Sequence, residues 1–235
     1  MSAPTLTDLL YIKRGFLSKE QCEIIINEFK SNHHKQHLEK YRDASTAKRK
    51  ESTYTVVHSQ IGSKSFNLIH STVEKIINQY HDYLDSFDAF NKARRATLMH
   101  PHVYRILKYE KGASIQPHSD HDMGVYGSCT INLNDEYTGG DFCFWNGKHR
   151  LKLGQGDVII FPADHFWVHE VKQITSGVRY STNTFLCKMP RHLPEDVKFK
   201  IDNLNQDFAQ SRLSRNLIAQ DQDTAKSFKS HITYG

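Results

Sequence analysis

The chain has 235 residues, of which 38% are hydrophobic and 24% charged, and it carries a net charge of +5. This length and composition are ordinary for a soluble globular protein with one main hydrophobic core. No apolar run approaches the roughly 18 residues that a membrane span needs, and the first residues lack a signal-peptide pattern, so we expect a cytoplasmic protein without a membrane partner.

Two helices are predicted in the first hundred residues. Ser18 and Gln21 form a capping-box pair, and the apolar residues that follow them recur at helical spacing, which predicts a helix over about 18–31. A second apolar stripe steps by threes and fours from Phe66 to Leu84 and predicts a longer helix. Both stripes are typical of helices that pack against a core.

Most of the net positive charge lies between these helices. Residues 35–50 include six Lys or Arg and only two acids, without apolar periodicity. The simpler interpretation is a solvated, exposed loop; the alternative is a surface that meets an acidic partner.

The pattern changes after residue 101 to short segments rich in β-branched and aromatic residues, separated by Gly-containing turns. Such closely spaced strands without crossover helices predict an antiparallel sandwich or barrel with helices packed on it. We therefore expect residues 1–100 to be a helical support region of the same domain and 101–189 to be the core. Residues 190–235 are expected to form a helical or partly disordered tail.

The stretch PHSDHD places two histidines and two aspartates within residues 117–122. On an extended segment residues two apart share a face, so His118 and Asp120 are expected to point the same way. An imidazole beside a carboxylate supplies two corners of a 2-His-1-carboxylate site for non-haem iron(II).

The candidate for the third corner is His169, in the strand-like segment FWVHEV. A calcium loop starting at Asp120 lacks a later carboxylate at the right spacing. Zinc could use the same three ligands, but no H-E-x-x-H motif supports a hydrolase and the four cysteines form no C-x-x-C pair. The remaining alternative is that His118 and His169 are hydrogen-bonded core histidines.

Arg179 lies ten residues after His169, on a predicted strand whose alternate positions are Arg179, Ser181 and Asn183. A guanidinium that faces the interior of a barrel needs an anion, and a carboxylate that accepts two hydrogen bonds suits it. The alternatives are a small dicarboxylate ligand and a structural salt bridge to an internal acid; few acids fall on the predicted inner faces, which favours the ligand.

The run of Tyr109, His118, Asp120, Gly139-Gly140, His169 and Arg179 resembles the iron(II)- and 2-oxoglutarate-dependent dioxygenases, most closely their prolyl 4-hydroxylase-like branch. The resemblance covers roughly residues 10–188. It implies an α+β protein with a double-stranded β-helix, or jelly roll, as its core.

The same resemblance implies roles for individual residues. His118, Asp120 and His169 would ligate iron(II), and Arg179 would bind the distal carboxylate of 2-oxoglutarate. Tyr109, in the Y-E-K-G turn, would lie near the cosubstrate. Thr130 and Asn132 would line the cosubstrate pocket. Oxygen would be the second cosubstrate, with ascorbate as an optional reductant.

Two positions depart from the pattern of the branch. Its members usually carry a lysine where this chain has Arg179, although arginine occurs across the wider superfamily. They also tend to have a tyrosine three residues before the first metal histidine, where this chain has Ile115. The second departure weakens the case for a prolyl substrate.

The resulting hypothesis is an oxidoreductase that hydroxylates an unactivated C–H bond on a peptidyl residue of a peptide or protein partner, with proline as one candidate residue, and that releases succinate and CO2. A nucleic-acid demethylase would use the same iron residues and the basic segment 35–50, but that group usually has a second arginine after the last histidine. A small-molecule or free amino acid hydroxylase stays open. The non-enzyme alternative is a jelly-roll module that binds metal for structure.

Overall fold

The computed structural model describes residues 3–42, 49–96, 98, 100–101, 104–121 and 125–187. All of them lie within one compact unit, Met1–Met189. The predicted tail, 190–235, lies outside the described residues.

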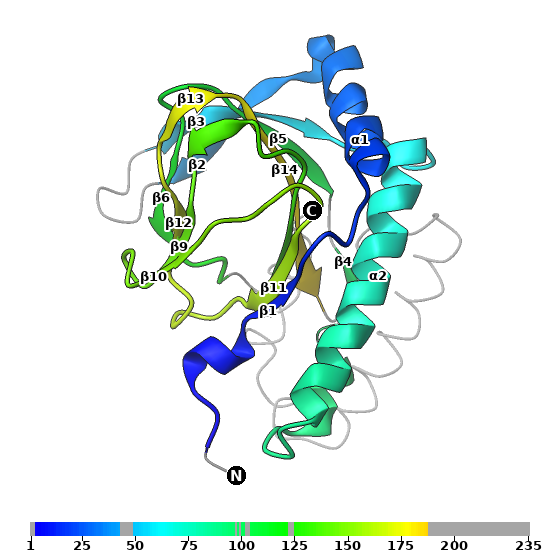
Figure 1. Ribbon diagram of the computed structural model, residues 1–235, viewed down its shortest axis with the longest axis vertical. Helices are drawn as coiled ribbons and strands as arrows, with labels where there is room; N and C mark the ends of the chain where they lie inside the picture. The colour runs from blue at the N-terminus through cyan, green and yellow to red at the C-terminus, as the bar shows by residue number, and fades with distance from the viewer. Residues whose placement is uncertain are drawn as a thin grey trace, which may run out of the picture. The chain divides into compact units, whose positions relative to one another are not determined.

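Two antiparallel sheets face each other and enclose the core (Figure 1). The major sheet has eight strands, in the order β1 (Tyr11–Lys13), β11 (Val158–Pro162), β7 (Val125–Asn132), β14 (Arg179–Cys187), β5 (Arg105–Tyr109), β3 (Arg49–His58) and β2 (His37–Arg42), with β4 (His100–Pro101) paired to β14. The minor sheet has four strands, in the order β10 (His149–Leu151), β9 (Phe142–Phe144), β12 (His169–Val171) and β6 (Ile115–His118). A separate pair joins β13 (Ile174–Gly177) to β8 (Tyr137–Gly139).

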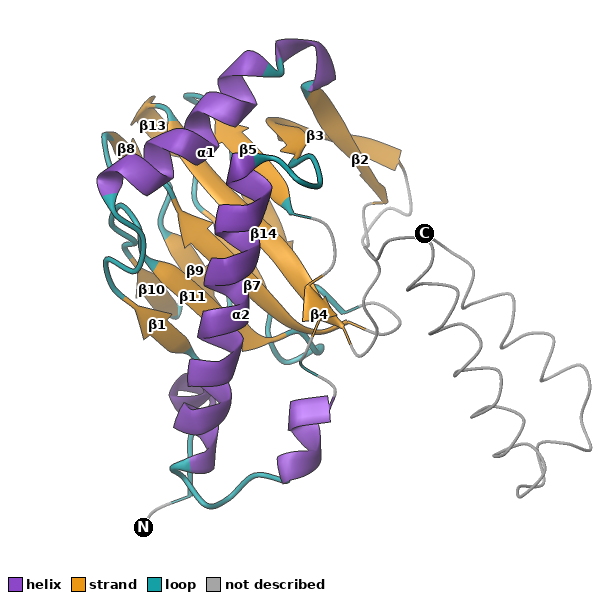
Figure 2. Ribbon diagram, turned by 90° about the vertical axis from the view of Figure 1, so that its right-hand side faces the viewer, coloured by secondary structure: helices purple, strands orange, loops and turns teal. Residues whose placement is uncertain are grey.

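Two α-helices, α1 (Lys19–Ser31) and α2 (Lys64–Asp85), cover the outer face of the major sheet (Figure 2). Both were predicted, and Ser18 caps α1 through the expected capping box with Gln21. Short 3-10 helices lie at Leu6–Leu9, His33–Lys35 and Lys92–Ala96. Among the described residues, no helix is long and apolar enough to cross a membrane.

The alternation of side chains along β7 separates the core into two parts. Cys129 and Ile131 point outward and pack with the apolar faces of the two helices. Ser128, Thr130 and Asn132 are also buried, but they point inward, toward the minor sheet. The inner face of the major sheet therefore carries polar groups that an ordinary sandwich core would not bury without a partner or a function.

The N-terminal third differs from its predicted form. The basic segment 35–50 is not simply a loop, because β2 and the start of β3 pair in antiparallel register, with Lys40 opposite Glu51. The strands β1, β2 and β3 all join the major sheet, so this region contributes sheet as well as supporting helices.

Candidate active site

The predicted metal ligands come together where β6 and β12 pair. His118 and His169 are direct partners across these antiparallel strands, with ring centroids 4.4 Å apart. The two Nε2 atoms each lie 3.3 Å from an oxygen of Asp120. One ligand atom from each residue lies within 4.8 Å of the other two. This arrangement fits a single metal ion bound by two imidazoles and one carboxylate.

Backbone carbonyls orient both imidazoles. Nδ1 of His118 donates to the carbonyl oxygen of Gln116 at 2.9 Å, and Nδ1 of His169 donates to that of Trp167 at 3.0 Å. Since a carbonyl oxygen only accepts, each neutral ring keeps its proton on Nδ1 and offers the Nε2 lone pair to the metal position.

Asp120 reaches the site differently from the prediction. The strand β6 ends at His118, so Asp120 lies beyond it and does not share a strand face with the histidine. Its Oδ2 atom accepts a hydrogen bond from Oγ of Ser128 at 2.5 Å. Ser128 was not predicted; its place two residues before Thr130 on the same strand face was the signal that could have found it.

The charges of the cluster suit a metal ion. Burial alone would raise the pKa of Asp120, but the imidazoles of His169 and His118, when they also carry a proton on Nε2, hold that pKa well below its usual range through their charge and a hydrogen bond. Burial lowers the pKa of His169. For His118 burial acts in the same direction, yet the hydrogen bond and charge of Asp120 raise its pKa overall. The cluster therefore offers a permanent carboxylate beside imidazoles.

An aromatic layer backs the metal cluster. The ring of Phe142 stacks on His169 at 5.4 Å between centroids, and Phe161 meets the same imidazole edge-on at 5.0 Å. These rings help to bury His169, which is 5% exposed.

Arg179 lies deep in the same interior, at the start of β14. Its side chain is 1% exposed, and its guanidinium lies 4.9 Å from the ring centroid of Tyr109, its partner residue on β5. Nε donates to Oδ1 of Asn132 at 3.0 Å. Nη1 is buried without a hydrogen-bond partner, and within the described part of the chain no acid pairs with this guanidinium. A buried cation with an unused donor fits a carboxylate ligand and argues against a structural salt bridge.

The strand β7 connects the two halves of the site. Ser128 binds Asp120 at the metal end, and Asn132 binds Arg179 at the other end. Thr130 lies between them on the same inward face and is 8% exposed. The predicted residues therefore line one interior, but the polar atoms of Asn132 are bonded to Arg179 and to other protein groups and do not face an open pocket.

A second arginine, missed by the sequence analysis, faces this interior from β5. Nε of Arg105 donates to Oδ1 of Asn183 at 2.9 Å, its Nη1 pairs with Glu39, and its guanidinium lies 4.7 Å from the centroid of Phe185. Its position four residues before Tyr109, on the same strand face, was the available signal. Because Glu39 neutralises the charge of Arg105, this arginine is less suited than Arg179 to bind an anionic ligand.

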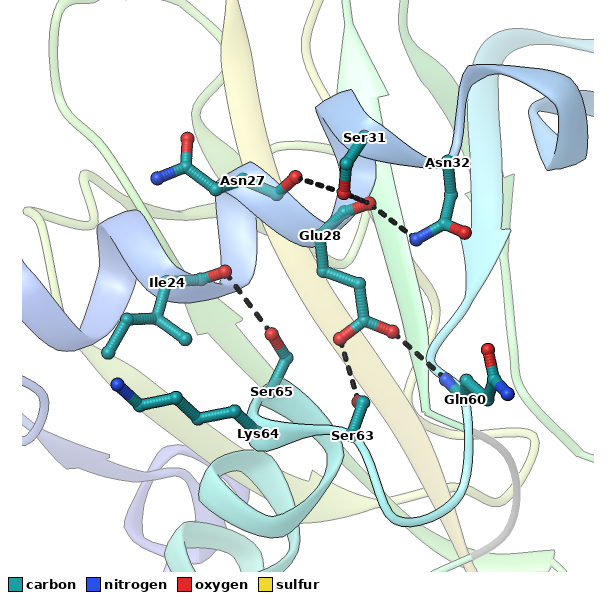
Figure 3. Close-up of a pocket in the computed structure, with 9 residues that line it drawn as sticks. All are labelled: Ile24, Asn27, Glu28, Ser31, Asn32, Gln60, Ser63, Lys64 and Ser65. Atoms are coloured by element: carbon teal, nitrogen blue, oxygen red, sulfur yellow. Dashed lines mark hydrogen bonds between the residues drawn. The ribbon is translucent and has the colours of Figure 1, made fainter.

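A hollow elsewhere, between α1 and the start of α2, is lined by polar residues (Figure 3). The carboxylate of Glu28 accepts hydrogen bonds there from the Ser63 hydroxyl at 2.9 Å and from the backbone N–H of Gln60 at 3.0 Å. Ser65 donates to the carbonyl oxygen of Ile24 at 3.2 Å. These bonds hold the beginning of α2 against α1, which is a structural task.

Comparison with known proteins supports an iron- and 2-oxoglutarate-binding site in the jelly-roll segment. Residues 104–187 match the model of the 2OG-Fe(II) oxygenase superfamily. A PKHD-type hydroxylase of Acinetobacter baumannii is 30% identical over 119 residues, which cover 49% of this chain and 43% of the relative. The matched part of the chain thus covers less than half the length of these curated relatives, between 43% and 49% of each.

Solved structures share the fold. A Pseudomonas putida prolyl-4-hydroxylase superposes with a TM-score of 0.55 at 14% identity, over 76% of this chain and 92% of that chain. A prolyl hydroxylase of Trichoplax adhaerens, solved with a peptide fragment of the hypoxia inducible factor oxygen degradation domain, superposes with a TM-score of 0.54 at 15% identity, over 77% and 84%. The predicted jelly-roll fold is therefore confirmed, and the predicted resemblance to the iron(II)- and 2-oxoglutarate-dependent dioxygenases is confirmed for residues 104–187.

Proposed function

We propose that the protein is an iron(II)- and 2-oxoglutarate-dependent dioxygenase that hydroxylates a C–H bond of a peptide or protein substrate and releases succinate and CO2. The observation that carries the proposal is the unpaired buried Nη1 of Arg179, which shares one interior with the His118, Asp120 and His169 cluster. A metal cluster kept only for structure would have no use for a buried cation with a free donor nearby.

The residues present would divide the work as follows. His118, Asp120 and His169 would hold iron(II) and leave coordination positions open for ligands other than protein. Arg179 would bind the distal carboxylate of 2-oxoglutarate, with Tyr109 beneath its guanidinium. When bound, iron and 2-oxoglutarate supply the oxidising chemistry, so the protein needs no acid, base or nucleophile of its own.

The peptide substrate is supported by the fold neighbours, one of which was solved with a peptide. Ile115, in place of the tyrosine usual in prolyl hydroxylases, leaves the target residue as part of the proposal. Nucleic acid is the competing substrate class, because Lys40, Arg49 and Lys50 are exposed on strands β2 and β3 and could contact phosphates.

The first experiment adds 2-oxoglutarate to the iron(II)-loaded protein without oxygen and records the visible spectrum. A weak charge-transfer band is expected, because the keto acid would chelate the metal through two oxygens. A folded, iron-loaded protein that shows no band and no calorimetric binding of 2-oxoglutarate contradicts the proposal.

The second experiment screens for succinate formation with proline-rich peptides, single-stranded nucleic acids and free amino acids as substrates. Stimulation by peptides alone is expected. Stimulation by nucleic acid alone, with salt-dependent binding, would instead identify the demethylase alternative.

A further inference from the structure

The side chain of Asn132 is fully buried, and both of its polar atoms are committed. Nδ2 donates toward three backbone carbonyl oxygens, those of Asn134 at 2.7 Å, Leu153 at 3.1 Å and Gly154 at 3.2 Å. Oδ1 accepts from Nε of Arg179 at 3.0 Å and from the hydroxyl of Tyr137 at 3.2 Å. The side chain that was predicted to line the cosubstrate pocket is therefore a connector behind Arg179.

The amide of Asn132 has only one workable orientation. Turning it over would place Oδ1 against the three carbonyl oxygens, where no donor is available, and would place Nδ2 against the Arg179 donor. The acceptor that Arg179 meets is thus always the amide oxygen. Unlike a carboxylate, this oxygen carries no net charge, so it fixes the arginine without neutralising it.

The guanidinium is confined on its other sides as well. The ring of Tyr109 lies 4.9 Å from its centre. Gly140 packs so closely that a Cβ atom there would lie 3.3 Å from Cδ of Arg179 and 3.0 Å from Cε2 of Tyr137. With Nε tied to Asn132, the Nη1 side is the part of the guanidinium left for a ligand.

We propose that Asn132, held in turn by Tyr137, is a positioning residue that keeps Arg179 aimed and electrically uncompensated, and so gives the pocket its preference for a keto acid with a distal carboxylate. The inference rests on the proposed function, because it concerns the same cosubstrate pocket. Asn132 itself would not touch the cosubstrate.

The test compares two keto acids that chelate iron in the same way, 2-oxoglutarate and 2-oxobutyrate, of which the second lacks the distal carboxylate. Their dissociation constants are measured by calorimetry on the iron(II)-loaded protein without oxygen. The ratio of the two constants reports the contribution of the distal carboxylate. For the wild type we expect a preference of roughly 10- to 100-fold for 2-oxoglutarate, the range of a hydrogen bond between charged groups.

Two variants address the connector. Asn132→Asp keeps the shape of the side chain but places a negative charge next to the Arg179 guanidinium. We expect this variant to lose most of the preference for 2-oxoglutarate. Tyr137→Phe removes only the second bond to Oδ1, and we expect the preference to fall about two- to fivefold, as for the loss of one neutral hydrogen bond. In both variants the dissociation constant of 2-oxobutyrate should stay near the wild-type value.

The control is Ile131→Ala, which weakens the same strand from its helix-covered face. It should lower the melting temperature and leave the preference unchanged. If Asn132→Asp does not fold, Tyr137→Phe decides the question.

The outcomes separate the two proposals. A wild type with no preference for 2-oxoglutarate overturns the proposed function. A wild type that has the preference, together with variants that keep it or that lose affinity for both acids equally, overturns the role of Asn132 and leaves the function standing.

Discussion

The two ends of the barrel interior hold their functional side chains in opposite ways. At the metal end His118 keeps 39% of its side chain exposed, and both imidazoles are held by carbonyl oxygens of their own strand segments. At the other end Arg179 is 1% exposed and is held by the side chain of Asn132, which is distant in the chain. The open end suits exchange of ligands with solvent, and the closed end suits recognition of a fixed charge.

This difference separates what each end contributes. Damage to the metal end should abolish metal binding and with it everything that depends on the metal. Damage to the arginine end should affect only the cosubstrate.

The largest effect is expected for Asp120→Ala. The variant loses the only carboxylate of the cluster and leaves two facing imidazoles, so we expect iron affinity to fall by more than about 100-fold, beyond the range seen for groups that merely support ligands. Iron content after gel filtration measures it. His121→Ala, next to the cluster in sequence, should keep its iron; an Asp120→Ala protein that keeps its iron would show that the carboxylate is no ligand.

Arg179→Ala should come second and should separate the two ends. We expect the dissociation constant of 2-oxoglutarate to rise about 10- to 100-fold, because a charge-assisted hydrogen bond is lost, while iron content stays at the wild-type level. Arg179→Lys should recover part of the affinity, since an ammonium is also a cation. Equal loss of iron and of 2-oxoglutarate would mean that Arg179 has a structural role.

Ser128→Ala should have a smaller effect, confined to the metal end. Its hydroxyl orients Asp120, so we expect iron affinity to fall by roughly tenfold, the lower part of the range for second-sphere groups. Metal competition with a chelator measures the change. Ser128→Thr keeps the hydroxyl and should restore the affinity; failure of that variant, with a normal melting temperature, would count against the hydrogen bond.

The smallest effect lies outside both ends, on α2. Hydrogen bonds from Arg95 and Arg94 lower the pKa of Asp85 from its ordinary value of 3.8 to about 2. A carboxyl group with a lowered pKa in the folded state adds stability above its unfolded pKa and loses that contribution as the pH falls toward the folded value. Asp85→Asn should therefore be slightly less stable than the wild type at pH 7, and the difference should shrink between about pH 4 and 2. Urea unfolding at several pH values measures it; a difference that is independent of pH would exclude this ion pair as the cause.

Much of the metal end could be predicted from the sequence because each of its ligands leaves a short-range signal. His118 and Asp120 are two residues apart, and His169 stands in an apolar strand segment where an unpaired imidazole is costly. Alternation along the predicted strand likewise indicated that the side chain of Arg179 faces the interior. The prediction did not need the exact path of the chain, and it survives the finding that Asp120 lies beyond the end of β6.

The environment of Asn132 could not be predicted in this way. Its amide meets the carbonyl oxygens of Leu153 and Gly154, which come from a loop about twenty residues away. No periodicity in the sequence reports such a contact. The predicted roles of Thr130 and Tyr109 toward the cosubstrate stay predictions, whereas for Asn132 the proposed role is to position Arg179 and not to contact the cosubstrate.

The hairpin of β2 and β3 was missed for another reason. The alternation that identifies a strand comes from burying one face, and β2 lies at the edge of the sheet with exposed residues such as Leu38 and Tyr41. A strand that buries little leaves no apolar pattern to recognise.

The turn at Gly139-Gly140 sets a practical limit on engineering this pocket. Both residues have positive φ, 77° and 67°, and a Cβ atom would lie 2.2 Å from the carbonyl oxygen of Gln173 at the first and 2.5 Å from Cδ1 of Ile174 at the second. A saturation library aimed at accepting other keto acids would lose nearly every member that changes either glycine. Directed evolution of cosubstrate choice should leave this turn untouched and place its diversity at Thr130 and Tyr137.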